Sequence, residues 1–428
     1  MSEFTLTEDQ EQALYGFTMF LSSPDPFFRI TGYAGTGKTT LITHINQTIE
    51  SIIATETALN PRFVCREVVY LATTNKAAQA FEEIINEPVE TLHSYLCIQP
   101  DKNYRTGKTD GYKHNRSRPR REQAGDYYQK LFFVDEASMI DWALFNEFLE
   151  TIEDCKVVFI GDPAQLTPVQ STGTPVYEQD WPEALLERVV RQEAGNPIID
   201  FATAFRCTVN GGPWLENFTP DQQSIVYLSR DDFDYEVEKE FCSLDWSPSE
   251  SRLLGFTNSL VNYYNSEISR VVYGTDVFQK GQYYILNKAV IFPKARFKTD
   301  AIVKVTGVAQ TSRYGLAGWH IDINDRTTLF MPSNYEAKKQ LIKEKRLAKQ
   351  WDVVQEIEDQ WADLRPIYAS TVHKSQGSTF DRVFLDLDDL RKCTSPRTLA
   401  RLMYVAVSRA RSQIIMTGDL VAEERKSA

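Results

Sequence analysis

The residues most suggestive of chemistry form a glycine-rich run, G-Y-A-G-T-G-K-T, at positions 32–39. The run follows an apolar stretch, 27–30, and precedes a stretch, 41–53, in which apolar residues recur at helical spacing. A strand, a glycine-rich turn and a helix in this order place backbone N–H groups and the positive end of the helix around phosphate oxygens. The run therefore predicts a binding site for a nucleoside triphosphate.

The side chains of this loop have distinct expected roles. Lys38 would bind the β and γ phosphates, and Thr39 would offer its hydroxyl to a magnesium ion, Mg2+. An incidental glycine-rich turn is the alternative, which the preceding strand disfavours. The nucleotide-binding residues expected from the loop are Gly32, Ala34, Gly35, Thr36, Gly37, Lys38, Thr39 and Thr40.

Two further apolar runs lead into acidic residues. The run 131–134 ends in Asp135, which would hold the magnesium ion directly or through water, and Glu136, which would polarise the attacking water. The run 157–160 leads into G-D-P-A-Q-L, where Gln165 would sense the γ-phosphate. An apolar strand that ends in acids is common and is weak evidence by itself. After a phosphate-binding loop it is strong evidence for a nucleotide site.

Phosphoryl transfer also needs positive charge from elsewhere, because Lys38 and a magnesium ion neutralise the transition state incompletely. Arg191, in V-V-R-Q, and Arg409, in Y-V-A-V-S-R-A-R, are the two candidates. A surface ion pair is the usual fate of an arginine and is the alternative for each.

Composition bounds the class of protein. With 428 residues, 42% of them hydrophobic, the chain is long enough for two to four compact domains. It lacks an apolar run of membrane-spanning length and a signal peptide at its N-terminus, which predicts a cytoplasmic protein. Its six cysteines form no C-x-x-C pair, so neither a zinc site nor a disulfide framework is expected.

Charge is unevenly distributed along the chain. The net charge of −12 argues against a protein that coats nucleic acid through bulk electrostatics. Between Asp101 and Glu122, however, eight Lys/Arg and three acids give a net charge of +5. A basic insertion in an acidic chain suits a motor that grips and releases a polyanion, and a solvated loop is the alternative.

Short apolar runs alternate with helix-patterned stretches, which predicts two α/β lobes with parallel sheets. Strands are expected at 27–30, 68–72, 131–134 and 157–160, and in the latter half at 253–257, 383–387 and 414–417. Between the latter strands, 276–328 reads as a small β-barrel and 334–364 as a charged helical arm. Trp351 and Trp361 of the arm are expected to make core contacts rather than to form a stacking platform.

Six motifs then occur in order along the chain. They are G-Y-A-G-T-G-K-T (32–39), D-E-A-S-M (135–139), G-D-P-A-Q-L (161–166), V-V-R-Q (189–192), H-K-S-Q-G-S-T (373–379) and Y-V-A-V-S-R-A-R (404–411). This set resembles the superfamily 1 helicases, in particular the RecD-like branch, superfamily 1B, and within it the small Dda-type phage helicases. The resemblance spans nearly the whole chain and implies two RecA-like lobes that clamp ATP and step along single-stranded DNA.

The resemblance also implies a domain plan within an α/β fold. Both RecA-like P-loop lobes contain parallel sheets, the first with a β-hairpin insertion and the second with a small SH3-like β-barrel plus a helical arm. The expected boundaries are 1–94 and 125–188 for lobe 1A, 95–124 for the hairpin 1B, 189–275 and 366–428 for lobe 2A, and 276–365 for the barrel and arm 2B.

Further nucleotide contacts follow from the resemblance. Gln10 would read the adenine as part of a Q-like motif, although Thr7 followed by Gln10 fits a helix capping box equally well. The backbone of Gly377 would approach the γ-phosphate. The catalytic set is then Lys38, Glu136, Gln165, Arg191 and Arg409, with both arginines contributed by the second lobe.

A translocase must tolerate any sequence, so its DNA contacts are expected to be phosphate contacts and base stacking. For His93 and His373 the alternative is a satisfied buried histidine. By the resemblance, the basic stretch corresponds to a hairpin that acts as a separation pin, with the D-G pair at 110–111 as its turn signal. Tyr104 and Tyr112 flank this signal, and one of them would act as the wedge by stacking on the last base pair. The DNA-binding residues that the resemblance implies are Thr74, Asn75, Thr91, His93, Tyr104, Tyr112, Thr371 and His373.

These observations predict an ATP-dependent DNA helicase that moves 5′ to 3′ and unwinds duplex DNA by strand exclusion. Its cofactors would be ATP and Mg2+, and its partners single-stranded DNA, forked duplex DNA and a single-strand-binding protein. It would act as a monomer without a membrane, in the host cytoplasm if it is encoded by a phage. An RNA helicase and a non-motor, nucleotide-switched subunit of a recombination complex are the alternatives.

Overall fold

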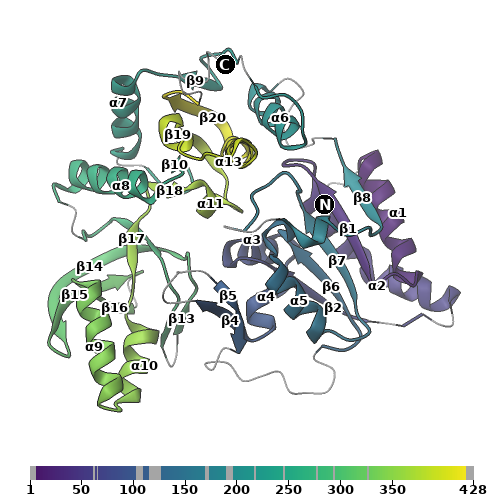
Figure 1. Ribbon diagram of the computed structural model, residues 1–428, viewed down its shortest axis with the longest axis horizontal. Helices are drawn as coiled ribbons and strands as arrows, with labels where there is room; N and C mark the ends of the chain where they lie inside the picture. Colours follow the sequence, from purple (N-terminus) through teal and green to yellow (C-terminus); the bar gives the residue numbers. More distant parts are fainter. Residues whose placement is uncertain are drawn as a thin grey trace. The chain divides into compact units, whose positions relative to one another are not determined.

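The computed structural model describes residues 6–60, 63–64, 66–102, 109–114, 127–168, 173–188, 196–215, 218–243, 246–275, 278–292, 295–324 and 327–420. Contacts divide the chain into two compact units, whose elements are labelled in Figure 1. The first unit contains 1–217 and 395–408, and the second contains 218–394 and 409–428. The chain therefore passes between the units at three places. This grouping differs from the expected boundaries, because 189–217 and 395–408 belong to the first unit.

The first unit is built on a parallel sheet. Its six strands lie in the order β3 (Val89–Thr91), β2 (Glu67–Ala72), β6 (Lys130–Asp135), β7 (Lys156–Gly161), β1 (Phe27–Gly32) and β8 (Glu183–Leu186). The sequence predicted the four longer strands, β1, β2, β6 and β7, and missed the short β3 and β8. Because the strands are parallel, their carboxyl ends and the loops that follow them meet along one edge.

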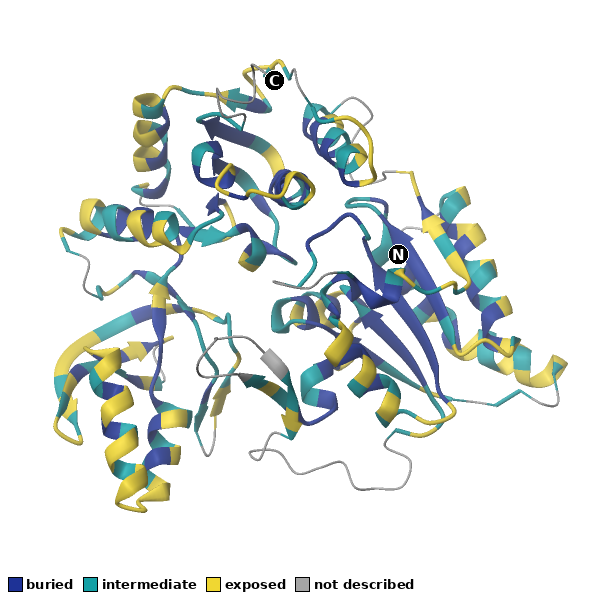
Figure 2. Cartoon of the chain, in the orientation of Figure 1, coloured by how far each residue is buried: buried dark blue, intermediate teal, exposed yellow. Residues whose placement is uncertain are grey.

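Helices cover both faces of this sheet. They are α1 (Glu8–Ser22), α2 (Lys38–Leu59), α3 (Asn75–Ile85), α4 (Leu92–Tyr95) and α5 (Trp142–Thr151). The first unit also contains α6 (Pro197–Val209), α13 (Pro396–Ser408) and the short 3-10 turns η1 (Ala137–Met139) and η2 (Pro175–Tyr177). Phe17, Ile45 and Phe81 belong to one apolar cluster, and Phe132 and Phe148 to a second. The strands are mostly buried, as Figure 2 shows. Helices α6 and α13 pack on each other.

A two-stranded hairpin, β4 (Ile98–Lys102) and β5 (Thr109–His114), extends the first unit. Its register pairs Ile98 with His114 and Asp101 with Gly111. The prediction of a hairpin is confirmed, but the placement of its turn at 110–111 is wrong, because these residues lie within β5. The connection between the strands falls in 103–108, outside the described residues.

The second unit contains another parallel sheet, with strands in the order β18 (Ala369–Thr371), β10 (Ser251–Gly255), β19 (Phe380–Asp386), β20 (Ala410–Thr417) and β9 (Ile225–Tyr227). Its helices are α7 (Arg230–Phe241), α8 (Asn258–Tyr273), α11 (Val372–Ser375) and α12 (Leu387–Leu390). The expected strands at 253–257, 383–387 and 414–417 correspond to β10, β19 and β20. The prediction of two α/β lobes with parallel sheets is therefore confirmed.

An antiparallel sheet in the second unit occupies the region expected to form a barrel. Its strands lie in the order β16 (Thr327–Pro332), β15 (Leu316–Ile323), β14 (Ile302–Arg313), β11 (Tyr283–Leu286) and β17 (Leu364–Pro366), with a separate hairpin of β12 (Val290–Phe292) and β13 (Ala295–Phe297). Tyr284, Val303 and Ile321 belong to its core. The description of this sheet as SH3-like stays a prediction.

Two helices, α9 (Tyr335–Leu347) and α10 (Trp351–Gln360), form the predicted arm. Trp361, which follows α10, is fully buried and packs on Phe330 with a ring-centroid distance of 4.5 Å. The expected core contact is confirmed for Trp361. It is wrong for Trp351, which is 59% exposed at the first position of α10.

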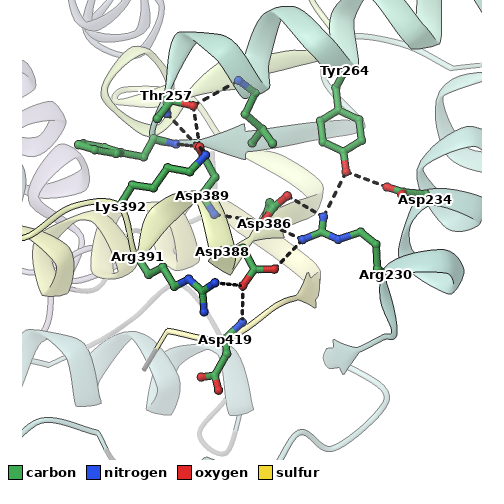
Figure 3. A network of polar contacts seen from close by, with 12 residues as sticks. Arg230, Asp234, Thr257, Tyr264, Asp386, Asp388, Asp389, Arg391, Lys392 and Asp419 are labelled. Carbon is green, nitrogen blue, oxygen red and sulfur yellow. Dashed lines mark hydrogen bonds and ion pairs between the residues drawn. The ribbon is translucent and has the colours of Figure 1, made fainter. Parts of the chain in front are cut away.

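Charged residues tie the end of β19 to the starts of α7 and α8, as Figure 3 shows. Arg230 donates to both carboxylate oxygens of Asp386, at 2.6 and 3.1 Å, and to Asp388 at 2.9 Å. Asp389 accepts the N–H groups of Phe256 (2.7 Å) and Thr257 (2.8 Å) and the Thr257 hydroxyl (2.6 Å). These contacts fix the turn between β10 and α8.

The helices of the described ranges include none that combines the length and the apolar character needed to cross a membrane.

Candidate nucleotide and nucleic-acid sites

The glycine-rich loop lies between β1 and α2, as predicted. Gly35 and Gly37 have φ angles of 82° and 78°, which only glycine adopts readily. Gly37 is the N-cap of the 22-residue helix α2 and provides no side-chain cap. The first N–H groups of a long helix are therefore left without a capping side chain, which is the arrangement that binds a phosphate group.

Gln10 buttresses this loop from α1. Its side chain accepts the Thr7 N–H at 3.0 Å, and the Thr7 hydroxyl accepts the Gln10 N–H at 3.4 Å, which completes the predicted capping box. Its amide also donates to the Gly37 carbonyl at 3.1 Å. A side chain at Gly37 would collide with the Gln10 amide, so the loop requires glycine here. The capping alternative is confirmed, and the adenine-reading role stays a prediction.

Lys38 and Asp135 belong to the same site. The Lys38 Nζ donates to the carbonyl oxygens of Gly32 (2.6 Å) and Tyr33 (2.9 Å). Burial raises the pKa of Asp135, while a backbone hydrogen bond and the charge of Lys38 act against that rise. Thr39 lies beside Lys38 in the first turn of α2. Hydroxyl and carboxylate oxygens are the ligands that Mg2+ prefers, so these residues fit a divalent cation beside a phosphate.

Glu136, the expected water-polarising residue, has an unusual backbone. Its φ of 53° and ψ of 44° lie in the left-handed region, which is strained for a residue with a side chain. Its carbonyl accepts a hydrogen bond from the Thr73 hydroxyl at 3.2 Å, and its φ directs the chain from β6 into η1. Strain of this kind is concentrated at functional sites.

The turn after β7 is held by a residue that the motif analysis did not single out. Asp162 is fully buried and accepts the Ala164 N–H at 2.9 Å and the Tyr404 hydroxyl at 2.5 Å. The same hydroxyl accepts the Ala34 N–H at 2.9 Å. Ala34, expected to bind nucleotide, therefore directs its N–H to Tyr404. Through one hydroxyl, α13 joins the phosphate loop to the Asp162 turn.

Two arginines extend this contact between helices and loops. Arg401, one helical turn before Tyr404, donates to the carbonyl oxygens of Pro163 (2.7 Å) and Gln165. Arg206 of α6 lies over the Tyr33 ring, with 3.6 Å between guanidinium carbon and ring centroid. Sequence reasoning missed both arginines. The three-residue spacing of Arg401 and Tyr404, which places them on one helix face, was the available signal.

The other predicted nucleotide contacts belong to the second unit or fall outside the described residues. Arg191 falls outside the described residues. Arg409 and Gly377 belong to the second unit, where Arg409 is buried and donates to the Ser378 carbonyl at 3.1 Å. Gly377 has a φ of 77° in the turn after α11. Their approach to a γ-phosphate stays a prediction.

The three predicted DNA-binding threonines share one local geometry. Thr74, Thr91 and Thr371 are the N-caps of α3, α4 and α11, and each hydroxyl accepts the backbone N–H of the third residue of its helix. Each follows a parallel strand, so each lies at the carboxyl edge of its own sheet. A capping hydroxyl still carries a hydrogen that a phosphate oxygen can accept.

The two T-x-H motifs repeat this geometry in both units. His93 and His373 each lie two residues after a capping threonine, in the four-residue helices α4 and α11. Burial lowers the pKa of both histidines, despite an opposing charge from Asp141 near His93. Both imidazoles are therefore neutral at neutral pH. Asn75 is the first residue of α3.

Tyr112 does not lie at the tip of the hairpin. It is in β5, where its hydroxyl donates to Asp141 at 3.4 Å and its ring lies 5.2 Å from that of His93. The expected flanking position beside the turn is wrong, because the turn signal at 110–111 was misread. Tyr104 lies outside the described residues.

Comparison with known proteins gives independent evidence on the family. A family model described as an AAA domain matches residues 5–207, and one described as a UvrD-like helicase C-terminal domain matches 366–417. The ATP-dependent DNA helicase dda of Enterobacteria phage T4 is 25% identical over 466 aligned residues, covering 96% of this chain and 98% of that protein. The RecD subunit of the Haemophilus influenzae RecBCD enzyme is 27% identical over 155 residues, covering 34% of this chain and 23% of that protein.

The fold has a counterpart among solved structures. A crystal structure of a Pif1 helicase from Bacteroides, in complex with ADP-AlF3 and single-stranded DNA, matches with a TM-score of 0.51 and 14% identity, covering 98% of this chain and 94% of that chain. The fold, the two domain matches and the full-length similarity to the phage protein agree with the resemblance seen in the motifs. The resemblance to the RecD-like, superfamily 1B helicases is therefore confirmed.

Proposed function

We propose that this protein moves 5′ to 3′ along single-stranded DNA and unwinds duplex DNA ahead of it by strand exclusion. The observation that carries the proposal is the uncapped N-terminus of α2 beside two acid-tipped strands, β6 and β7. ATP bound there would supply the γ-phosphate whose transfer to water drives movement. Direction rests on the branch of the family alone.

Each residue of the site has a role in this proposal. Lys38 leaves the carbonyl oxygens of its own loop and binds the β and γ phosphates. Thr39 and Asp135 hold Mg2+, and Glu136 orients and polarises the attacking water. Tyr404 and Arg401 hold the turn that contains Gln165 on α13. Because the turn is anchored, Gln165 keeps a fixed position from which to sense the γ-phosphate.

Positive charge from two arginines completes hydrolysis in this scheme. Arg409 leaves the Ser378 carbonyl and stabilises the charge that develops on the γ-phosphate. Arg191, in the V-V-R-Q motif, stabilises the same charge. Gly377 brings its backbone to the same phosphate. Closure of the two units around ATP and their reopening after hydrolysis then move one grip on DNA relative to the other.

The two grips are the T-x-H motifs. Thr91 with His93 serves the first unit and Thr371 with His373 the second, while Thr74 and Asn75 extend the first grip. Because the histidines are neutral, they contribute hydrogen bonds or stacking, and the threonine hydroxyls contact phosphates. Such contacts tolerate any base sequence, as translocation requires.

Unwinding of forked duplexes tests the activity and its direction together. A duplex with only a 5′ single-stranded tail should be unwound in the presence of ATP and Mg2+, and the same duplex with only a 3′ tail should not. Lys38→Ala is the matched inactive control, because it removes the phosphate ligand and keeps the loop. Unwinding from the 3′ tail alone would reverse the proposed direction.

The remaining parts of the proposal concern substrate, partners and location. An RNA helicase is the main alternative, and it predicts stronger stimulation of hydrolysis by RNA than by DNA oligomers. A non-motor switch predicts nucleotide binding without unwinding, and the presence of Lys38, Glu136 and Arg409 argues against it. We further propose that the protein is a cytoplasmic monomer that works beside a single-strand-binding protein. Sedimentation at the working concentration tests whether it is a monomer.

A further inference from the structure

Tyr177 places a buried hydroxyl at the hydrolytic site. The residue ends η2, and among the described residues its hydroxyl has no hydrogen-bond partner. A buried hydroxyl without a partner costs free energy, because the hydrogen bonds it made to water in the unfolded chain are not replaced. Such a group in a folded protein calls for an explanation beyond packing.

The position of the hydroxyl is defined by Gly161, the last residue of β7. A Cβ built on Gly161 would collide with the Tyr177 hydroxyl and would lie 3.2 Å from the backbone nitrogen of Ala137. Ala137 directly follows Glu136, and η2 packs against η1. The glycine of the G-D-P-A-Q motif therefore makes room for this hydroxyl beside the residue expected to polarise water.

Carboxyl groups surround the hydroxyl. Burial raises the pKa of Tyr177 far above its ordinary value, and Asp162, Glu136, Asp135 and Glu183 raise it further. The phenol is therefore protonated at neutral pH, and towards an ionised carboxylate it acts as a hydrogen-bond donor. Asp162 already accepts from Tyr404 and Ala164, and Glu183 from Arg29 and Thr31. Of the four acids, Glu136 is the one that begins the turn on which η2 packs.

We propose that Tyr177 is a positioning residue for ATP hydrolysis, whose hydroxyl donates a hydrogen bond to the Glu136 carboxylate when the site is loaded. This bond selects the carboxylate oxygen that faces the attacking water. The inference rests on the proposed function, because it assigns Glu136 the role of polarising that water. It adds a residue that lies outside all six motifs.

Tyr177→Phe tests the inference, because it removes the hydroxyl and keeps the ring. The kcat of DNA-stimulated hydrolysis should fall roughly 10- to 100-fold, the range for loss of one hydrogen bond to a charged group. The KM for ATP and the Kd for a single-stranded oligonucleotide should stay unchanged. The melting temperature should stay the same or rise, because a buried unsatisfied hydroxyl has been removed. An unchanged kcat would refute the inference.

Tyr70→Phe is the matched control. Tyr70 is also a buried tyrosine of the first unit, but its hydroxyl donates to Asn46. The control should lower the melting temperature and leave kcat unchanged, the opposite of the pattern expected for Tyr177→Phe. If Tyr177→Phe instead lowers the melting temperature and kcat together, its role is structural and the inference fails.

A double-mutant cycle identifies the partner. In a Glu136→Gln background, measured by single-turnover hydrolysis, Tyr177→Phe should have little further effect, because the hydroxyl acts through Glu136. A full additional loss would show that the hydroxyl acts elsewhere. Failure of the proposed function would give a different result. The turnover of ATP by the wild-type enzyme or by Lys38→Ala would then be the same with and without DNA.

Discussion

Tyr404 donates a 2.5 Å hydrogen bond to Asp162, although 242 residues of sequence separate them. Asp162 is fully buried and Tyr404 nearly so. The acid follows the fourth predicted strand of the first lobe, and the tyrosine belongs to the last motif of the chain. The contact therefore links the turn that contains Gln165 to the helix that ends immediately before Arg409.

Replacing Tyr404 with phenylalanine removes this bond and leaves Asp162 buried with one donor fewer. We expect a loss of about 1.5–3 kcal/mol in the free energy of unfolding, the range for a hydrogen bond to a charged group. Hydrolysis should also slow, because Ala34 and the Gln165 turn lose their common anchor. Urea unfolding and steady-state ATPase assays measure the two effects. Normal stability together with normal turnover would contradict the assigned role.

Arg409 and Arg411 provide a matched pair of arginines two residues apart. Arg409 is buried and is the proposed source of charge for the transition state, whereas Arg411 is exposed and pairs with Asp381 at 3.2 Å. Arg409→Ala should lower kcat by about 10³-fold or more with DNA affinity kept. Arg411→Ala should change kcat less than twofold, since a surface ion pair contributes little. Equal effects of the two substitutions would remove the special role of Arg409.

Asp389 and Asp388 provide a second matched pair, one buried and one partly exposed, for testing the network of Figure 3. Asp389 is 1% exposed and accepts three hydrogen bonds from Phe256 and Thr257, whereas the Asp388 side chain is 39% exposed. Asp389→Ala should destabilise the protein by about 2–4 kcal/mol, because buried N–H groups lose their acceptor. Asp388→Ala should cost about 1 kcal/mol or less.

The stability that Asp389 contributes should also depend on pH. Burial acts to raise its pKa, but hydrogen bonds from Lys392, Thr257 and Phe256 outweigh burial and lower it below the ordinary value. A lowered pKa in the folded state stabilises the protein above the unfolded-state pKa of about 3.9, and this contribution is lost as the pH falls through the folded-state pKa. The stability difference between wild type and Asp389→Asn should therefore shrink below about pH 4. A difference that is constant from pH 6 to pH 2 would contradict this assignment.

The two tyrosines of the predicted hairpin should differ in their effect on unwinding. Tyr112 packs beside His93 within β5, so Tyr112→Phe should leave the coupling of hydrolysis to unwinding intact. Tyr104 belongs to the stretch that connects β4 and β5, and Tyr104→Ala should lower base pairs unwound per ATP hydrolysed. Comparing unwinding with ATPase rates in both variants measures this ratio. Unimpaired unwinding by Tyr104→Ala would exclude it as the wedge.

The sequence was sufficient for residues whose role is local. Gly37, Lys38 and Asp135 could be assigned because a strand, a turn and a helix within a few residues define a phosphate site. The threonine caps at Thr91 and Thr371 could likewise be recognised from short motifs. The strands β3, β8, β9 and β18 were missed because three or four residues are too short to show a period.

Long-range contacts were beyond the reach of sequence patterns. Nothing near Tyr404, Arg401 or Tyr177 indicates a partner, because their contacts are made by folding segments that are distant in the chain. The turn at 110–111 was misplaced because an Asp-Gly pair is a strong local signal that strand pairing overrode at β5. The core contact predicted for Trp351 was wrong. Its spacing fits the apolar face of the helix, but it is the first residue of α10 and is exposed to solvent.

The return of residues 395–408 to the first unit has a consequence for biosynthesis. A ribosome releases the nucleotide-binding residues of that unit long before it makes the helix that carries Tyr404. A nascent chain that stops short of this helix contains the whole glycine-rich loop but no donor from α13 for Asp162. The phosphate loop and the Asp162 turn therefore acquire their shared anchor on α13 only after the last motif has been translated.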